Sequence, residues 1–319
     1  ENLNIVAVAE THIHADFLSG GREFAERFNT KLFLSDEGDA DWKYEWVKEK
    51  KQDGTDYDYQ LLKDGDTFTI GNIDIVAVHT PGHTPEHMSF VVIDRGGGAS
   101  TPIGTGTHRH QGIVAVGAGG KGIGFGRVEN THLGHADPGL LGLSPHGVQE
   151  PSARTLFSSL PKFTEMEDYV QVWPAHGAGS TCGKALGAVP TTTVGYEKLY
   201  NASLDVASRG EDEFVAAILA GQPEPQTYFA RMKRDNKLGA PVLGNLPNPR
   251  RLTAFELNHI AGSSKHLIVD TRLDRSGFMA HHIPGSIYAP MNKSFNTVVG
   301  SLVEDETTPI VLIAAEEHV

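Results

Sequence analysis

Short apolar runs alternate along the chain with segments in which apolar residues recur at helical spacing. Runs rich in aliphatic and β-branched residues are typical of strands, and spacings of three and four residues are typical of amphipathic helices. Strands and helices that alternate in this way form α/β layers, so the sequence predicts an α/β fold. The predicted strands comprise residues 4–8, 32–34, a hairpin at 66–75 with its turn at Gly71 and Asn72, 75–79, 88–93, 170–173, 267–270 and 310–313; the predicted helices comprise residues 22–28, 153–160, 164–169, 194–204 and 212–220.

Residues 96–147 break this pattern. They contain sixteen of the 36 glycines, a density that disfavours regular structure because glycine loses much backbone entropy on folding. Within them only residues 112–117 (GIVAVG) are typical of a strand. The spacing GxGxxG at 117–122 matches a dinucleotide fingerprint, but Gly124 and Gly126 oppose the helix that such a site needs, so we interpret the match as chance. A shifted reading frame is the alternative explanation of this composition.

A second change in composition falls at residues 221–251, which are rich in Pro, Asn, Gly, Lys and Arg and are typical of a linker or a loose domain edge. A length of 319 residues predicts two domains, at about 150 residues each. We therefore expect a first domain over residues 1–240 and a second over residues 250–319. Apolar runs lie within a few residues of both ends, so we expect the chain to be part of a longer protein.

The formal net charge of −13 narrows the classes of partner that we expect. Phosphates and anionic lipids repel such a chain, so we expect neither nucleic acid nor a membrane as partner. The longest apolar run, residues 214–220, is far shorter than the roughly 20 residues of a membrane helix. The single cysteine, Cys182, excludes an internal disulfide and is consistent with a reducing, cytoplasmic location. Whether the chain forms a homo-oligomer is left open.

The clearest chemical signal comes from histidines that follow predicted strands. In the motif THIHAD the side chains of His12, His14 and Asp16 project to the same side, because residues two apart share a face of an extended segment. His83, in TPGH, and His176, in PAHG, each follow another predicted strand. Neutral imidazoles beside carboxylates can hold a first-row divalent metal. The sequence therefore predicts a metal centre at the ends of strands.

The order of these motifs resembles the metallo-β-lactamase superfamily. That resemblance implies an αββα sandwich, here incomplete at its N-terminal side. Members with two metals carry a further histidine directly after the aspartate, at the position where this chain has Phe17. The resemblance therefore favours a branch with one iron over two-zinc hydrolases such as glyoxalase II.

The motifs around His12 and His176 closely resemble bacterial persulfide dioxygenases, in which two histidines and one aspartate hold a mononuclear Fe(II). By position, the two histidines are His12 and His83. The resemblance places His14 and Asp16 near the metal, His14 as a further ligand and both as catalytic or orienting groups. It also implies a catalytic role for His176. His79 and His87, which flank the TPGH motif, are expected beside the site or at the surface.

The third ligand of that family is an aspartate in a Thr-Gly-Asp turn, which this chain lacks. Asp137 is the only aspartate between Asp94 and Asp168, and it lies in the glycine-rich segment. It is therefore the candidate for the missing carboxylate ligand.

The last part of the chain resembles the rhodanese fold. The resemblance rests on residues 269–272 (VDTR) and 282–286 (HIPGS). Rhodaneses carry their nucleophilic cysteine at the end of a later strand, at the position where this chain has Ala314. The resemblance implies a partial, cysteine-free rhodanese-like domain that binds or channels sulfur species, or packs against the first domain.

These features favour a non-haem iron persulfide dioxygenase, which converts glutathione persulfide or a related thiol persulfide, with O₂, to sulfite and the thiol. Fe(II) is the expected cofactor and zinc the alternative. The first alternative function is a zinc hydrolase of the glyoxalase II or lactamase type. The second is no catalysis at all, an inactive fragment or a sulfur-relay scaffold, because the usual third ligand and the rhodanese cysteine are both missing.

Overall fold

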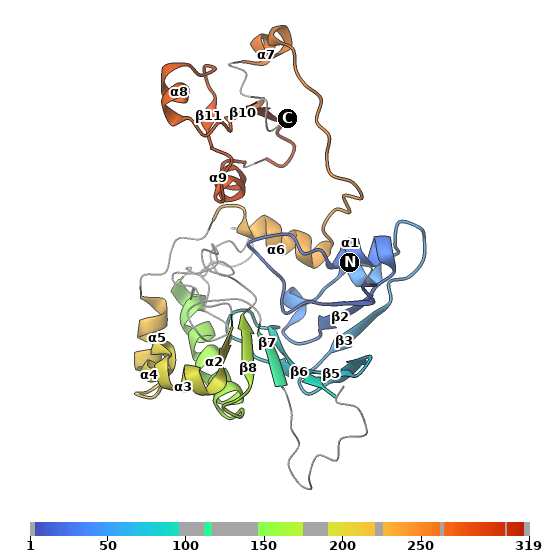
Figure 1. The fold of residues 1–319 in the computed structure, drawn as a ribbon, viewed down its shortest axis with the longest axis vertical. Helices are drawn as coiled ribbons and strands as arrows, with labels where there is room; N and C mark the ends of the chain where they lie inside the picture. The colour runs from blue at the N-terminus through green and yellow to red at the C-terminus, as the bar shows by residue number, and fades with distance from the viewer. Residues whose placement is uncertain are drawn as a thin grey trace. The chain divides into compact units, whose positions relative to one another are not determined.

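The computed structural model describes residues 4–95, 112–116, 146–174, 191–220, 226–261, 265–303 and 305–315 (Figure 1). Its chain divides into two compact units, Glu1–Pro225 with Phe229–Gly244, and Gln226–Tyr228 with Asn245–Val319. Each unit combines helices with strands, which confirms the α/β prediction. No helix among the described residues is long and apolar enough to cross a membrane.

The described part of the first unit holds two sheets. In the first, parallel sheet, β2 (Lys31–Ser35) lies between β1 (Ala7–Ala9) and β3 (Tyr59–Leu62). The second sheet is antiparallel except where β7 runs parallel to β8. Its order is β4 (Thr67–Ile70), β5 (Ile73–His79), β6 (Met88–Asp94), β7 (Gly112–Val116), β8 (Gln171–Pro174) and β9 (Thr192–Thr193).

The strand β2 shows how the two sheets come to pack face to face. Its alternate residues point to opposite faces, as in any strand. Leu32 and Leu34 enter one apolar cluster with the helix α1 (Gly21–Phe28), the 3₁₀ helices η1 (Ala40–Trp42) and η2 (Trp46–Lys48) and their surroundings. Phe33 points the other way, and its ring stacks on that of Phe68 from the second sheet at 3.7 Å between centroids. The strand is therefore buried on both faces, which explains its continuous apolar sequence.

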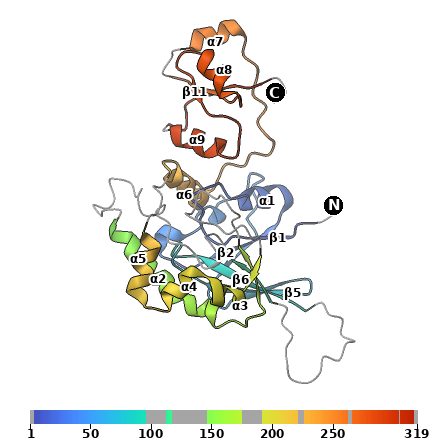
Figure 2. The same cartoon turned by 60° about the vertical axis from the view of Figure 1, so that its left-hand side comes forward.

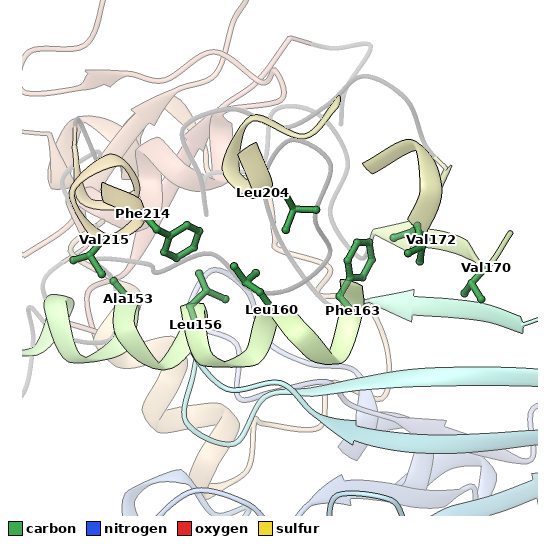
Figure 3. Close-up of a cluster of buried hydrophobic side chains, with 10 residues drawn as sticks. Ala153, Leu156, Leu160, Phe163, Val170, Val172, Leu204, Phe214 and Val215 are labelled. Carbon is green, nitrogen blue, oxygen red and sulfur yellow. The ribbon is translucent and has the colours of Figure 1, made fainter. Parts of the chain in front are cut away.

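The outer face of the second sheet is covered by the helix α2 (His146–Thr164). Its buried residues Ala153, Leu156, Leu160 and Phe163 follow one another at spacings of three and four, so they form a single stripe (Figure 3). The stripe packs against β8 and against the helices α4 (Ala202–Ala207) and α5 (Glu211–Leu219) (Figure 2). The helix α3 (Val194–Tyr200) comes directly before α4 in the chain. The four layers, helices, sheet, sheet and helices, have the order of the expected αββα sandwich.

Several boundaries differ from the sequence predictions. The hairpin at 66–75 is confirmed, but β1 covers Ala7–Ala9 instead of residues 4–8. The helix predicted over 164–169 is wrong, because α2 ends at Thr164 and the following residues form hydrogen-bonded turns. The helix predicted over 194–204 is two helices, because the side chain of Asn201 accepts the backbone N–H groups of Ser203 and Leu204 and starts α4.

The segment 221–251, predicted to be a linker or a loose domain edge, does contain the boundary between the two units, but it also contains a helix that was not predicted, α6 (Phe229–Leu238). Its sequence, FARMKRDNKL, is mostly polar, so it lacks the apolar stripe by which a packed helix is normally identified. Its two buried residues, Phe229 and Asn236, lie seven positions apart, and with polar contacts of Lys233 and Lys237 they hold α6 in place.

The second unit has a parallel sheet in which β10 (Leu267–Asp270) lies between β11 (Ile287–Tyr288) and β12 (Ile310–Ile313). Its small core contains Val269, Ala289 and Val299. The remaining elements are α7 (Ala254–Ile260), α8 (Arg275–Ala280) and α9 (Phe295–Leu302).

Candidate metal centre

The loop that follows β1 brings the first two histidines together. The side chain of Ile13 is fully buried in the apolar cluster around α1, and those of His12 and His14, one residue to either side, project away from it. Both histidines are buried, and their ring centroids lie 4.0 Å apart. This arrangement confirms the predicted juxtaposition of His12 and His14. It also shows that the apolar residue between them anchors the motif to the core.

His83 reaches the same place from the turn after β5. Its ring is perpendicular to that of His12, with 4.4 Å between centroids, and the two Nε2 atoms are 3.0 Å apart. The turn rests on α2. Ser159 Oγ donates a hydrogen bond to the carbonyl oxygen of Pro81 at 2.7 Å. At Gly82, where φ is +137°, a Cβ atom would lie 2.5 Å from Leu156 Cα, so only glycine permits this contact.

Asp16 and Phe17 both lie against His14. Asp16 Oδ1 lies 3.5 Å from His14 Nδ1, and both side chains are largely buried. The ring of Phe17 packs on the His14 ring at 4.1 Å between centroids and remains 43% exposed. An apolar ring therefore covers His14 at the position where the two-metal members of the resembled superfamily have a histidine.

Of the predicted site residues, the structure thus brings together His12, His14, Asp16 and His83. His176 and Asp137 lie outside the described residues. Their predicted roles stay predictions.

His87 is a fourth buried imidazole, and the expectation left its position open between the site and the surface. It is fully buried, 5.2 Å from His12 and 5.7 Å from His83 between ring centroids. Its Nδ1 lies 2.9 Å from Thr80 Oγ1, which fixes the orientation of the ring. His79, by contrast, turns away: its Nε2 lies 2.7 Å from the carbonyl oxygen of Pro85.

Sequence reasoning missed two buried carboxylates behind the histidines. Glu86 Oε1 accepts the backbone N–H of Ile13 at 2.7 Å, and burial raises the pKa of Glu86 to about 7. Glu10 accepts a hydrogen bond from Ser19 Oγ, and burial raises the pKa of Glu10 above its ordinary value. The one available signal was position, since Glu10 precedes the THIHAD motif and Glu86 precedes His87.

The facing nitrogens of His12 and His83 suit two adjacent ligand positions on a metal ion. For ring nitrogens about 2.1 Å from a metal, a separation of 3.0 Å corresponds to an angle of about 90° at the ion. Within the described ranges, no group of three or more His, Cys, Asp or Glu side chains is arranged to hold a metal. The described residues thus supply a fitting pair of nitrogens, and a complete site needs a further ligand.

Comparison with known proteins identifies the class of this fold. Residues 1–98 match the family model of the Metallo-beta-lactamase superfamily. The crystal structure of a metallo-beta-lactamase from Staphylococcus aureus subsp. aureus COL is similar to this chain with a TM-score of 0.72 and 32% sequence identity, covering 99% of this chain and 79% of that one. The chain belongs to the metallo-beta-lactamase superfamily, whose members are mostly metal-dependent enzymes that bind zinc or iron.

Two curated relatives are similar over part of their length. A probable metallo-hydrolase of Burkholderia pseudomallei (strain 1710b) is 37% identical over 93 residues, 27% of this chain and 30% of that protein. Glyoxylase B2 of Dictyostelium discoideum is 26% identical over 245 residues, 74% of this chain and 65% of that protein. The chain therefore spans less than two thirds of the length of either relative.

Proposed function

We propose that this chain is a non-haem iron persulfide dioxygenase. One molecule each of glutathione persulfide, O₂ and water would give glutathione, sulfite and two protons. The outer sulfur of the persulfide is oxidised, the sulfur–sulfur bond breaks, and O₂ is reduced. The observation that carries the proposal is the contact of Phe17 with His14, because an apolar ring there cannot help to hold a second metal ion.

The chain's own residues would perform three tasks in this reaction. His12 and His83 would hold the iron through the facing Nε2 atoms, with His14 as a further ligand. Asp16 would orient the His14 ring electrostatically, since Asp16 Oδ1 lies 3.5 Å from His14 Nδ1 and both side chains are largely buried. Fe(II) bound by two histidines and a carboxylate would supply open positions and the redox chemistry that O₂ requires. Asp137 remains the proposed carboxylate ligand and His176 a proposed catalytic residue.

For the second unit we propose an inactive rhodanese-like role. In support, Asp270 and Arg272 at the end of β10 pair with each other, and Arg272 also donates to the carbonyl oxygen of His281. After β12 the chain continues with Ala314 and Ala315, neither of which can act as a sulfur nucleophile. Such a unit could bind a sulfur species but could not transfer its sulfur through a cysteine.

A zinc-dependent hydrolase is the second candidate. The names of two relatives, a probable metallo-hydrolase and a glyoxylase, favour it. A bound zinc ion would lower the pKa of a water molecule to about 7, which suits attack on a thioester. An inactive chain or a sulfur-relay scaffold is the third outcome that an experiment has to distinguish.

The test is to purify the whole chain without oxygen, offer Fe(II), remove the excess, and measure the metal by elemental analysis. We expect about one iron per chain, as in a site with two histidines and one carboxylate. Addition of glutathione persulfide should then consume O₂ and produce sulfite in equal amounts. Preferential retention of zinc with hydrolysis of S-lactoylglutathione would replace the proposal by the hydrolase. A chain that retains neither metal would favour the inactive or scaffold role.

A further inference from the structure

The amide side chain of Asn236, on α6, uses three hydrogen bonds to hold the loop that carries His14 and Asp16. Its Nδ2 donates to the carbonyl oxygens of His14 and Phe17, each at 2.8 Å. Its Oδ1 accepts the backbone N–H of Ser19, also at 2.8 Å. Asn236 is 3% exposed, so water does not compete for these bonds. One side chain thus satisfies three backbone groups of a buried, irregular segment.

The positions of these groups define what Asn236 fixes. The carbonyl oxygens of His14 and Phe17 lie on either side of Asp16, so the backbone that carries the Asp16 side chain is tied at both ends. The other half of the loop is held separately, since Glu86 accepts the N–H of Ile13. Glu86 restrains the segment between the two histidines, and Asn236 restrains the segment around the aspartate. We call the three hydrogen bonds of Asn236 the Asn236 clamp.

Polar contacts along α6 hold Asn236 in place. The ammonium group of Lys233 lies 3.6 Å from the ring centroid of Trp42, within the range of a cation–π contact. Lys237 pairs with Glu45 at 3.2 Å, and its carbonyl oxygen accepts the backbone N–H of Glu45. These bonds attach α6 to the η1 and η2 region. The helix therefore has a rigid base from which to position a loop that lies 217 to 222 residues earlier in the chain.

We propose that Asn236 is a positioning residue for the metal centre, and that it sets the geometry of His14 and Asp16 without touching metal or substrate. This proposal rests on the proposed function in so far as it requires the centre to bind a metal. A purely structural role would make Asn236 important for stability alone.

The test compares two buried asparagines in the whole chain. Asn236→Ser removes the amide next to the site, and Asn201→Ser removes a buried amide that starts α4 in another part of the unit while keeping a capping hydroxyl. Cobalt(II), added to the metal-free protein, serves as the probe, because its visible absorption reports ligand geometry and its titration gives the affinity. We expect Asn236→Ser to weaken cobalt binding by about 10- to 100-fold and to change the spectrum, as loss of an outer support of a metal ligand does. Asn201→Ser should lower the melting temperature but leave affinity and spectrum unchanged.

A third variant keeps the test decisive if Asn236→Ser does not fold. Asn236→Asp retains the acceptor for Ser19 N–H but places a carboxylate against the carbonyl oxygens of His14 and Phe17. It should weaken cobalt binding at least as much as Asn236→Ser. If a folded variant at position 236 binds cobalt with the affinity and spectrum of the unmodified chain, the positioning role is overturned.

Hydrogen exchange separates failure of this proposal from failure of the proposed function. In the metal-free chain, amides of residues 15–19 should exchange at least about 10-fold faster in Asn236→Ser, whereas those of β2 should not change. If the unmodified chain binds no metal, the proposed function fails. If the exchange of residues 15–19 is then also unchanged in Asn236→Ser, the Asn236 clamp is overturned as well. Faster exchange confined to residues 15–19 would support the clamp even in that case.

Discussion

Two parallel sheets, β1–β2–β3 in the first unit and β11–β10–β12 in the second, each have polar residues at the end of a strand. The two sheets differ in how far away in the sequence the bonding partners of these residues lie. After β1, His12 faces His83, and the backbone beside it is held by Glu86, more than 70 residues away in sequence. After β10, Arg272 bonds with Asp270, two residues away. The first loop depends on distant elements, and the second satisfies its charges locally.

The pKa values of two buried carboxylates, Glu86 and Asp270, differ as a result. Burial raises the pKa of Glu86 to about 7, because its neighbours do not offset the loss of water. Burial also acts to raise the pKa of Asp270, but the hydrogen bonds and charge of Arg272 outweigh it and hold this pKa below its ordinary value. Polar residues at a strand end therefore do not by themselves make a site. The candidate site is distinguished by groups whose arrangement is imposed from elsewhere and by a carboxyl whose pKa is raised by burial that no neighbouring charge fully offsets.

Removal of a facing imidazole should have the largest effect. In His12→Ala or His83→Ala we expect the bound metal to be lost and persulfide oxidation to fall by about 1,000-fold or more, since a metal supplies several kcal/mol of transition-state stabilisation. Elemental analysis and oxygen uptake measure both effects. His79→Ala is the matched control, because that ring bonds to Pro85 away from the site. Full activity in His12→Ala would remove the distinction between the two loops.

Glu86→Gln should change how stability depends on pH. The folded-state pKa of Glu86 lies above the unfolded value, so its contribution is fully present below pH 4.5 and is lost as pH rises toward 7. At about 1.4 kcal/mol per pKa unit, the loss is about 3 kcal/mol. The amide side chain of the variant would still accept from the N–H of Ile13 but cannot ionise. We measure the free energy of unfolding of both proteins by urea titration. The value of the variant minus that of the unmodified chain should therefore increase as the pH rises from 4.5 to 7. A difference that does not vary with pH would contradict this account of Glu86.

Phe17→His tests why the first loop would hold a single metal. We expect zinc content to rise from about one toward about two ions per chain, and thioester hydrolysis to appear, because a further imidazole then lies beside Asp16. Phe28→His, which alters an exposed phenylalanine at the end of α1, should leave the zinc content unchanged. Equal zinc content in all three proteins would mean that Phe17 does not limit metal binding.

Arg272→Met should have the smallest effect on the candidate centre. Without Arg272 the buried carboxylate of Asp270 has no cation to offset the cost of its removal from water. The second unit should therefore lose about 1 to 3 kcal/mol of stability. Metal content and oxygen uptake should not change. A loss of metal on this substitution would show that metal binding depends on the loop after β10, so that the two loops would not be independent.

Local sequence pattern accounts for much of this molecule. Alternation places Ile13 inward with His12 and His14 on the other side, and the TPGH turn places His83 at a strand end, so the meeting of these residues was predictable. The residues that support them were not. Glu86 and Asn236 act through contacts that span 73 and 222 residues, and no periodicity or spacing encodes such contacts.

The same limit explains the errors in secondary structure. α6 was missed because its two buried residues, Phe229 and Asn236, form no apolar stripe, and the break at Asn201 was missed because one side chain starts a new helix inside an apolar pattern. Both cases are tertiary or capping effects that outweigh intrinsic propensity.

The contact of Gly82 with α2 has a consequence for engineering. The glycine-rich segment leaves β6 at Asp94 and rejoins the described fold at α2, while its strand β7 lies between β6 and β8. Because α2 also supports the turn of His83, one of the two attachment points of this segment already belongs to the framework that holds the pair formed by His12 and His83. The chain is thus a natural recipient for loop grafting: a donor segment that supplies a strand for the β7 position and a carboxylate could be exchanged as a cassette, and ligand sets could be compared on one unchanged histidine pair.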